Sequence, residues 1–404
     1  MLFRSDVTLF EANNYVGGHS NTKELPCGTP VDTGFIVLND WTYPNLIKLF
    51  DALNVPVAAT DMSFAVSANA GGFEYGGGSL RALFAQKRNW LRPRFWRMIF
   101  GIKRFYKHAP QWLQQNPASE LSLGDFLQQF NYHPSFVADH LVPMGAAIWS
   151  VPQAQMLQFP MRSFVQFCQN HGLLLFTGRP QWRTVVGGSL QYVVRLTANF
   201  ASNIKLNTPV LNVVGQNLTT HLGTQEFDKI IFACHANQAL KILGDSATQA
   251  QQNILGAFGY SQNVAYLHHD EKLMPKTKAT WSAWNYLAQN TKNLVLTYWM
   301  NLLQPLKTLL PTFVTLNPKS VPNKVVATIN YQHPQFNQAA WAAQQQLHTI
   351  QSAPHYFCGA YCGYGFHEDG LTAGLTVAEI ISGQPRPWVV VEKSCAKAHL
   401  LSPQ

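Results

Sequence analysis

The fold is decided by a stretch near the start of the chain, Asp6-Val7-Thr8-Leu9-Phe10-Glu11, and by the turn after it, Asn14-Tyr15-Val16-Gly17-Gly18-His19. The first run predicts a buried strand that ends in an acid, and the paired glycines predict a tight turn. In a dinucleotide-binding fold, an acid at the end of the second strand binds the adenosine ribose, about 20 residues after a Gly-x-Gly-x-x-Gly loop. Only five residues precede the strand here. This stretch therefore predicts the second half of such a motif without its first half.

A second glycine-rich turn lies near the other end of the chain and runs from a strand into a helix of small residues. Its sequence is Tyr356-Phe357-Cys358-Gly359-Ala360-Tyr361-Cys362-Gly363-Tyr364-Gly365-Phe366-His367-Glu368-Asp369-Gly370-Leu371. A strand, a tight turn and a helix N-terminus present unpaired backbone N–H groups to an electron-rich ligand. The two acids can accept hydrogen bonds from ligand hydroxyls, and the N–H groups of Gly370 and Leu371 can stabilise negative charge. The alternative is an acidic N-cap, in which Asp369 caps a helix that extends through Ala378.

Together, the two ends resemble the flavin-containing amine oxidase and phytoene desaturase superfamily, whose FAD contacts come from both chain termini. Longer strings resemble more narrowly a bacterial subfamily of NAD/FAD-binding oxidoreductases associated with cyclopropane fatty acid synthesis. These strings are Val31-Asp32-Thr33-Gly34-Phe35-Ile36-Val37, Pro143-Met144-Gly145-Ala146-Ala147-Ile148-Trp149-Ser150, Asn170-His171-Gly172-Leu173, Arg179-Pro180-Gln181-Trp182 and Gly365-Phe366-His367-Glu368-Asp369-Gly370. The resemblance covers nearly the whole chain. It implies an α/β fold with a Rossmann-like FAD-binding domain of the amine oxidase type and a second, α+β substrate domain.

The start of the chain departs from this family. Its members begin with a strand, the Gly-x-Gly-x-x-Gly loop and a helix, whereas this chain enters at the second strand, so we expect an N-terminally truncated chain. Without the first strand the parallel sheet loses its middle member, and without the loop the pyrophosphate loses its backbone N–H groups. We therefore expect weak FAD binding by these 404 residues.

The resemblance also implies which residues contact FAD. Glu11 binds the ribose, although it can also be read as a solvated edge acid. His19 stands where an arginine often follows the paired glycines, which replaces a fixed cation by a titratable group. The usual Gly-Glu pair is Gly359-Ala360 here, so the ribityl contact is expected to move to Glu368 or Asp369. The full expected set is Glu11, Gly17, Gly18, His19, Gly34, Val210, Gly359, Glu368, Asp369, Gly370 and Leu371.

Other motifs carry weaker signals. Gly187 and Gly188 either let the backbone approach the cofactor or form an ordinary turn ahead of a helix. We expect no metal site, because adjacent acids such as Glu368 and Asp369 cannot readily converge on one ion without a spaced partner. Large aromatics are expected near the substrate, although such residues usually belong to the core, and no catalytic residue is assigned. These aromatics are Trp149, Trp182, Trp284, Tyr286, Tyr298 and Trp299.

The composition is that of a globular protein with more than one core. Of the 404 residues, 47% are hydrophobic and 12% are charged, which excludes extensive disorder. No apolar run reaches the length of a membrane span, and the six scattered cysteines favour a reduced, cytoplasmic location. Changes of pattern predict FAD-binding parts at 1–75, 184–250 and 351–385, a helical cap at 76–183, a substrate-domain sheet at 251–350 and a tail at 386–404.

The net charge of +9 has a local origin. No acid lies between Glu74 and Glu120, whereas nine bases lie within residues 81–107 among large aromatic and aliphatic residues. Because this mixture is typical of a segment that lies on an anionic membrane surface, we expect peripheral contact with the inner face of the membrane through residues 81–107. The alternative is a helix that packs its aromatics on the core and solvates its charges. Nucleic acid binding is not expected, since no recognised reader motif accompanies the patch.

Two functions remain open at this point. The first is an FAD-dependent oxidoreductase that oxidises or desaturates an apolar, lipid-like substrate by hydride transfer to the flavin. The second is a non-catalytic, membrane-associated accessory protein of a fatty acyl modifying enzyme. Reduction of the flavin by candidate lipids under anaerobic conditions would separate the two.

Overall fold

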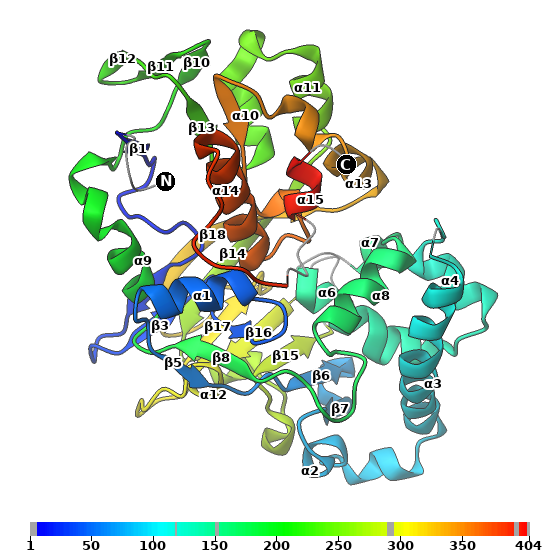
Figure 1. Ribbon diagram of the computed structural model, residues 1–404. Helices are drawn as coiled ribbons and strands as arrows, with labels where there is room; N and C mark the ends of the chain where they lie inside the picture. The colour runs from blue at the N-terminus through cyan, green and yellow to red at the C-terminus, as the bar shows by residue number, and fades with distance from the viewer. Residues whose placement is uncertain (1–5, 118, 150–152, 289–294, 392–395, 402–404) are drawn as a thin grey trace.

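The largest sheet has seven strands and lies at the lower centre of the molecule in Figure 1, which shows a computed structural model describing residues 6–117, 119–149, 153–288, 295–391 and 396–401. In spatial order the strands are β18 (Val325–Gln335), β14 (Gly259–His268), β17 (Phe313–Leu316), β16 (Val295–Trp299), β15 (Trp284–Leu287), β6 (Phe64–Ala68) and β7 (Phe73–Gly76). Neighbouring strands are antiparallel, except that β15 and β6 run parallel. Valine, threonine and aromatic residues are frequent in these strands, and such residues suit the pleated, half-buried surface of a sheet.

The upper part of the molecule holds two pairs of parallel strands. β1 (Leu9–Phe10) pairs with β9 (Ile204–Lys205), and β13 (Ile230–Phe232) pairs with β19 (His355–Phe357). Within the described residues, no ladder joins the two pairs. The helices around them are α9 (Leu190–Thr197), α10 (Ala236–Leu243), α11 (Gln249–Leu255), α13 (Gln338–Gln344), α14 (His367–Ser382) and α15 (Ala396–Leu400). A small antiparallel sheet consists of β10 (Asn212–Val214), β11 (Asn217–Thr220) and β12 (Gly223–Glu226). Parallel strands covered by helices form an α/β unit of the Rossmann-like kind.

A helical cap packs at the right of Figure 1. Its helices are α2 (Leu80–Leu83), α3 (Pro93–Gln115), α4 (Leu123–Gln129), α5 (Pro134–Phe136), α6 (Val142–Trp149), α7 (Gln153–Met156) and α8 (Met161–Asn170). Phe105 of α3 is fully buried against Phe126, Phe136 and Phe164, and Phe95 is fully buried beside Phe73 and Tyr75. One face of α3 therefore belongs to the largest apolar core. The core-packing alternative therefore holds for this face of the basic segment, whereas Trp90, Leu91 and Phe100 are exposed.

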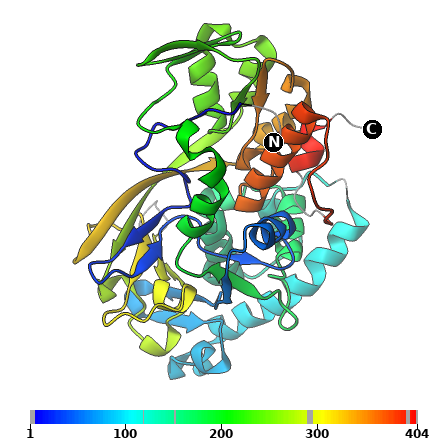
Figure 2. The ribbon, with the colours of Figure 1, turned by 60° about the vertical axis from the view of Figure 1, so that its left-hand side comes forward.

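Smaller elements connect these parts. They are the hairpin of β2 (Thr22–Glu24) and β3 (Pro30–Asp32), the sheet of β4 (Leu38–Asn39), β8 (Trp182–Val185) and β5 (Val57–Ala59), and the helices α1 (Pro44–Ala52) and α12 (Met300–Leu303). In Figure 2, α1 (blue) lies beside α14 (orange-red), although the two helices come from opposite ends of the chain.

The structure confirms several elements expected from the sequence and changes others. The sequence pattern predicts a helix near 44–53 and another at 190–199, and these are α1 and α9. It also predicts a strand over 280–286, but this strand begins only at Trp284, because residues 278–280 form a 3-10 turn. A further strand predicted over 293–299 falls partly on 289–294, outside the described residues. The seven-stranded sheet also takes in β6 and β7, so it does not follow the boundary expected at residue 75. No described helix has the length and apolar character needed to cross a membrane.

Candidate cofactor and substrate cleft

One large cavity is lined by residues from both ends of the chain and from the middle. Its volume is about 3480 Å³, against roughly 300–1,000 Å³ for an ordinary ligand pocket. Nine of the eleven expected cofactor residues line it: Glu11, Gly17, Gly18, His19, Gly34, Val210, Gly359, Gly370 and Leu371. Glu368 and Asp369 do not line this cavity. It has room for an extended ligand and a second molecule.

Glu11 follows directly after β1, where its backbone N–H continues the parallel pairing by donating to the Lys205 carbonyl at 2.9 Å. Its Oε1 accepts hydrogen bonds from both the backbone N–H and the side-chain amide of Asn13, each at 2.8 Å. Both donors use the same carboxylate oxygen. The second oxygen, Oε2, accepts no hydrogen bond from the described residues.

The paired glycines form a turn that a side chain would disturb. Gly17 and Gly18 have φ angles of 121° and 56°, a region that glycine adopts without strain. The turn packs backbone to backbone on the segment at Gly34, where a Cβ atom would lie 2.3 Å from the His19 carbonyl oxygen. The Phe35 N–H donates to that same oxygen at 2.7 Å. These glycines let two backbone segments meet along one wall of the cavity.

His19 lies in a cluster of aromatic and imidazole rings. It stacks on Tyr331 with ring centroids 4.8 Å apart, and the rings of His333 and His235 lie 5.4 and 6.4 Å away. Burial lowers the pKa of His19 to about 4 and that of His333 to about 3, so both rings are neutral at pH 7. The titratable group expected at His19 thus carries no charge near neutrality, unlike an arginine. No group of three or more His, Cys, Asp or Glu within the described residues is arranged to hold a metal.

A second imidazole, His367, stands at the start of α14 and lines the same cavity. Its ring stacks on Phe35 with centroids 3.9 Å apart, and its Nε2 lies 2.7 Å from the Tyr192 hydroxyl, which in turn contacts the Ser20 hydroxyl. Burial lowers the pKa of His367 to about 4. Sequence reasoning named His367 only as part of a turn, and it missed Tyr192, His235 and His333, because a single residue on a strand or helix carries no local signal of such a cluster.

Glu368 and Asp369 have roles within the protein that the sequence did not place correctly. Glu368 accepts hydrogen bonds from the backbone N–H groups of Asn45 at 2.8 Å and Leu46 at 3.0 Å, so it caps the start of α1. Burial raises the pKa of Glu368 to about 7. Asp369 is the third residue of α14 and accepts from the Phe366 N–H at 2.9 Å, so it supports the start of the helix from inside it, whereas the N-cap position expected for it is occupied by Phe366. The geometry therefore gives no support to a ribityl contact from either acid.

The structure also changes what was expected of Gly370 and of the pair Gly187 and Gly188. The Gly370 N–H donates to the Phe366 carbonyl at 3.2 Å, so it is not an unpaired donor even though Gly370 lines the cavity. Gly187 and Gly188 do not line the cavity, and Gly188 packs on the Thr22 side chain. For this glycine pair, the ordinary turn ahead of α9 is the observed arrangement.

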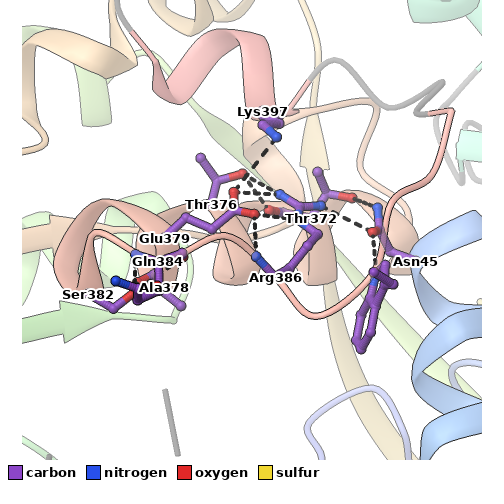
Figure 3. A network of polar contacts seen from close by, with 10 residues as sticks. Asn45, Thr372, Thr376, Ala378, Glu379, Ser382, Gln384, Arg386 and Lys397 are labelled. Atoms are coloured by element: carbon purple, nitrogen blue, oxygen red, sulfur yellow. Dashed lines mark hydrogen bonds and ion pairs between the residues drawn. The ribbon is translucent and has the colours of Figure 1, made fainter.

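A buried polar network fixes the segment after α14 against α1 (Figure 3). The Arg386 guanidinium donates to both carboxylate oxygens of Glu379, at 2.6 and 2.8 Å, and to Asn45 Oδ1 at 3.1 Å. The Arg386 side chain is only 5% exposed, and Lys397 approaches Glu379 at 3.8 Å. The Trp388 indole N–H also donates to Asn45 Oδ1, at 2.9 Å. Arg386 and Trp388 line the cavity, and no sequence pattern predicted this network.

Away from the glycine turns, the cavity becomes apolar. Its walls there come from α6, α8 and neighbouring strands and loops, and they include Phe64, Met144, Ile148, Trp149, Phe167, Leu173, Trp284, Tyr298 and Phe336. Three polar atoms along the whole cavity are buried without a hydrogen-bond partner in the described residues: His19 Nε2, Trp284 Nε1 and Tyr361 Oη. A buried polar atom without a partner is costly, so these atoms mark positions where a ligand can complete the site.

Comparisons with known proteins agree with this arrangement. The model of the family described as flavin containing amine oxidoreductase matches residues 4–382. Among solved structures, a redesigned putrescine oxidase is similar at 14% identity and a TM-score of 0.65, with 93% of each chain covered. A fatty acid isomerase from P. acnes is similar at 11% identity and a TM-score of 0.64, covering 90% of this chain and 89% of that one. A putative protoporphyrinogen oxidase from Exiguobacterium sp. 255-15 is 14% identical, with a TM-score of 0.63 and 93% of both chains covered.

These structural likenesses show a shared fold. A comparison with curated protein sequences gave no match.

Proposed function

Because the chain belongs to the family of flavin containing amine oxidoreductases, and is thus an FAD-dependent oxidoreductase, we propose that it oxidises or desaturates an apolar, lipid-like substrate by hydride transfer to the flavin. The observation that carries this proposal is the continuity of the cavity. One hollow joins the glycine turns to a chamber with aromatic and aliphatic walls. Apolar walls favour the apolar part of a ligand because they remove its surface from water.

The residues at the other end of the cavity fit the cofactor. Glu11 Oε2 can accept from a ribose hydroxyl, and the backbone around Gly17, Gly18 and Gly34 admits a close ligand because a Cβ atom there would meet backbone atoms or require an unfavourable φ angle. His19 Nε2 is a buried atom that still lacks a partner. FAD bound here would supply the hydride acceptor, while the protein supplies position and a dry environment.

Two exposed charged residues, Asp61 and Arg179, line the cavity near Phe64 and Leu173, whereas the elements that form the chamber walls favour a neutral substrate over an amine. No Asp or Glu among the described residues of α6, α8, β15 and β16 lines the cavity. A protonated amine would need a nearby carboxylate, because burying an unpaired charge is costly. The pKa of His140, which also lines the chamber, is lowered to about 4 by burial, so this ring adds no charge at neutral pH.

Anaerobic flavin reduction tests the proposal. The full chain is mixed with excess FAD and then with saturated or unsaturated phospholipids in micelles, or with putrescine, while the flavin absorbance is followed. We expect bleaching with a lipid and none with putrescine. Ile148→Lys, which places a charge in the chamber wall, should prevent bleaching, whereas Leu222→Lys, at a turn where the side chain is 66% exposed, should not.

An oxidised flavin with every lipid would contradict the proposal. If such a protein nevertheless bound a fatty acyl methyltransferase, the accessory-protein function would be favoured instead. Bleaching by putrescine with the same lipids inert would show that the enzyme acts on an amine.

A further inference from the structure

The exposed side of α2, of the 3-10 turn Lys87–Leu91 and of α3 carries an unusual number of apolar side chains. We name the exposed side chains of residues 80–107 the basic-aromatic face. Leu80 is 76% exposed, Leu91 88% and Phe100 65%. Soluble proteins seldom leave several such side chains in water on one short segment, and a patch of this kind marks an interaction surface.

A continuous row of aromatic rings runs along this face, with Trp90 and Phe100 exposed and Phe84 and Trp96 half-buried. The rings of Phe84 and Trp90 stack with centroids 4.0 Å apart, Trp90 and Trp96 are 6.0 Å apart, and Trp96 and Phe100 are 6.5 Å apart. The Trp96 indole N–H donates to the Trp90 carbonyl at 2.9 Å, which holds the turn on α3. The row is therefore a fixed part of the surface.

The charge of the face is positive and largely unopposed. The acid that comes closest, Asp139, is held by Arg94 through two hydrogen bonds of 2.7 and 2.8 Å. Arg97, Lys103 and Lys107 of α3 are exposed and form no hydrogen bond or ion pair within the described residues. Cations beside exposed aromatics match an anionic bilayer, whose headgroups attract the charges while the interface accepts the rings.

The cavity opens beside the same face. Gly77 and Gly78 line the cavity, are exposed, and lead directly into α2. Phe176 also lines the cavity and is 64% exposed, and its ring lies 5.1 Å from that of Tyr106, on the buried side of α3.

We propose that the basic-aromatic face docks on an anionic lipid bilayer and thereby places the opening of the cleft at the membrane surface. Docking itself is independent of the redox chemistry, whereas passage of a lipid substrate from the bilayer into the cleft rests on the function proposed above. Each cation near an anionic surface strengthens binding about fivefold, so three cations together contribute about a hundredfold. Raised salt weakens this contribution because it screens the charges.

Vesicle sedimentation with the full chain tests the docking. The probes are vesicles of phosphatidylcholine alone and vesicles of phosphatidylcholine with phosphatidylglycerol in equal parts. We expect binding to the second kind, and at least a tenfold loss of affinity in the variant Arg97→Glu/Lys103→Glu/Lys107→Glu. The matched control, Lys205→Glu/Lys229→Glu/Lys241→Glu, reverses three exposed cations of the upper part and should bind as the unchanged chain does.

The apolar contribution has its own pair of variants. Leu91→Ser with Phe100→Ser should weaken binding to the anionic vesicles, whereas Leu222→Ser with Leu211→Ser, two exposed leucines elsewhere, should not. Equal binding to both kinds of vesicle, full binding by the charge-reversed variant, or binding to nucleic acid without binding to vesicles would each overturn the proposal.

The redox assay separates this proposal from the previous one. If lipids in detergent micelles still reduce the flavin of the charge-reversed variant while lipids in vesicles no longer do, both proposals stand. Vesicle binding without reduction by any lipid would support the docking and remove only the proposed substrate.

Discussion

Replacing Glu379 by glutamine tests the buried network of Figure 3. The substitution keeps the size of the side chain but leaves the Arg386 guanidinium, which is 5% exposed, without its counter-charge. Hydrogen bonds from Arg386 lower the pKa of Glu379 from 4.5 to about 2. A shift of this size corresponds to about 3 kcal/mol at neutral pH, and removal of one partner from a buried ion pair typically costs 3–5 kcal/mol. Two separate arguments thus give a loss of about 3 kcal/mol in the free energy of unfolding.

The assay is urea denaturation at pH 7, followed by circular dichroism. Because the pKa of Glu379 is lowered in the folded state, its contribution is complete above pH 4.5 and is lost as the pH falls toward 2. The difference between Glu379→Gln and the unchanged chain should therefore narrow over that range.

The control is Asp51→Asn, which removes an exposed pair whose atoms lie 4.0 Å apart and should change stability by less than about 0.5 kcal/mol. If Glu379→Gln proved no more harmful than Asp51→Asn, the network would not hold α14 on α1 in the way that the geometry indicates.

Three further substitutions test the cleft and its supports. Gly34→Ala should sharply lower the FAD content, because its Cβ would lie 2.3 Å from the His19 carbonyl oxygen. The control Gly374→Ala, whose Cβ would have no atom within 4 Å, should keep its FAD. Equal flavin absorbance in the two variants would contradict this reasoning. Glu11→Gln should weaken FAD binding in a fluorescence titration about tenfold, since hydrogen bonds to a charged group contribute about 1.5–3 kcal/mol, and the exposed control Glu24→Gln should bind normally. Burial raises the pKa of Glu368 to about 7, so the free energy of unfolding should fall by about 3 kcal/mol as the pH rises from 4.5 to 7. In Glu368→Gln this fall should be absent when urea midpoints are measured across the same pH range.

Local sequence signals predicted the position of one wall of the cavity, although the buried strand expected over residues 6–11 is only the half-buried strand Leu9–Phe10. The acid-ended strand at Glu11 and the turn at Gly17 and Gly18 depend only on residues close together in the sequence and on the conformations that glycine permits. They line the cavity with Gly34 and Gly359. A backbone requirement of this kind is visible in the sequence itself.

Long-range partners could not be predicted in the same way. The hydrogen bond from Asn45 to Glu368 joins residues 323 positions apart, so nothing near Glu368 distinguishes a helix cap from a ligand contact. The same holds for His333, which meets His19 only because β18 passes the glycine turn. The pairing of β6 and β7 with the large sheet could not be predicted either. Alternation of apolar and polar residues predicts a strand, but it does not predict which other strand pairs with it.

The cap that Glu368 provides for α1 also has a consequence during synthesis. A ribosome adds roughly 5–20 residues per second, so Glu368 is synthesised roughly 20–60 s after the start of α1. During this time the N–H groups of Asn45 and Leu46 lack their acceptor. Throughout that interval the apolar residues around α1 lack their final cover and are open to chaperones. The start of α1 can therefore be capped only after most of the polypeptide has been synthesised.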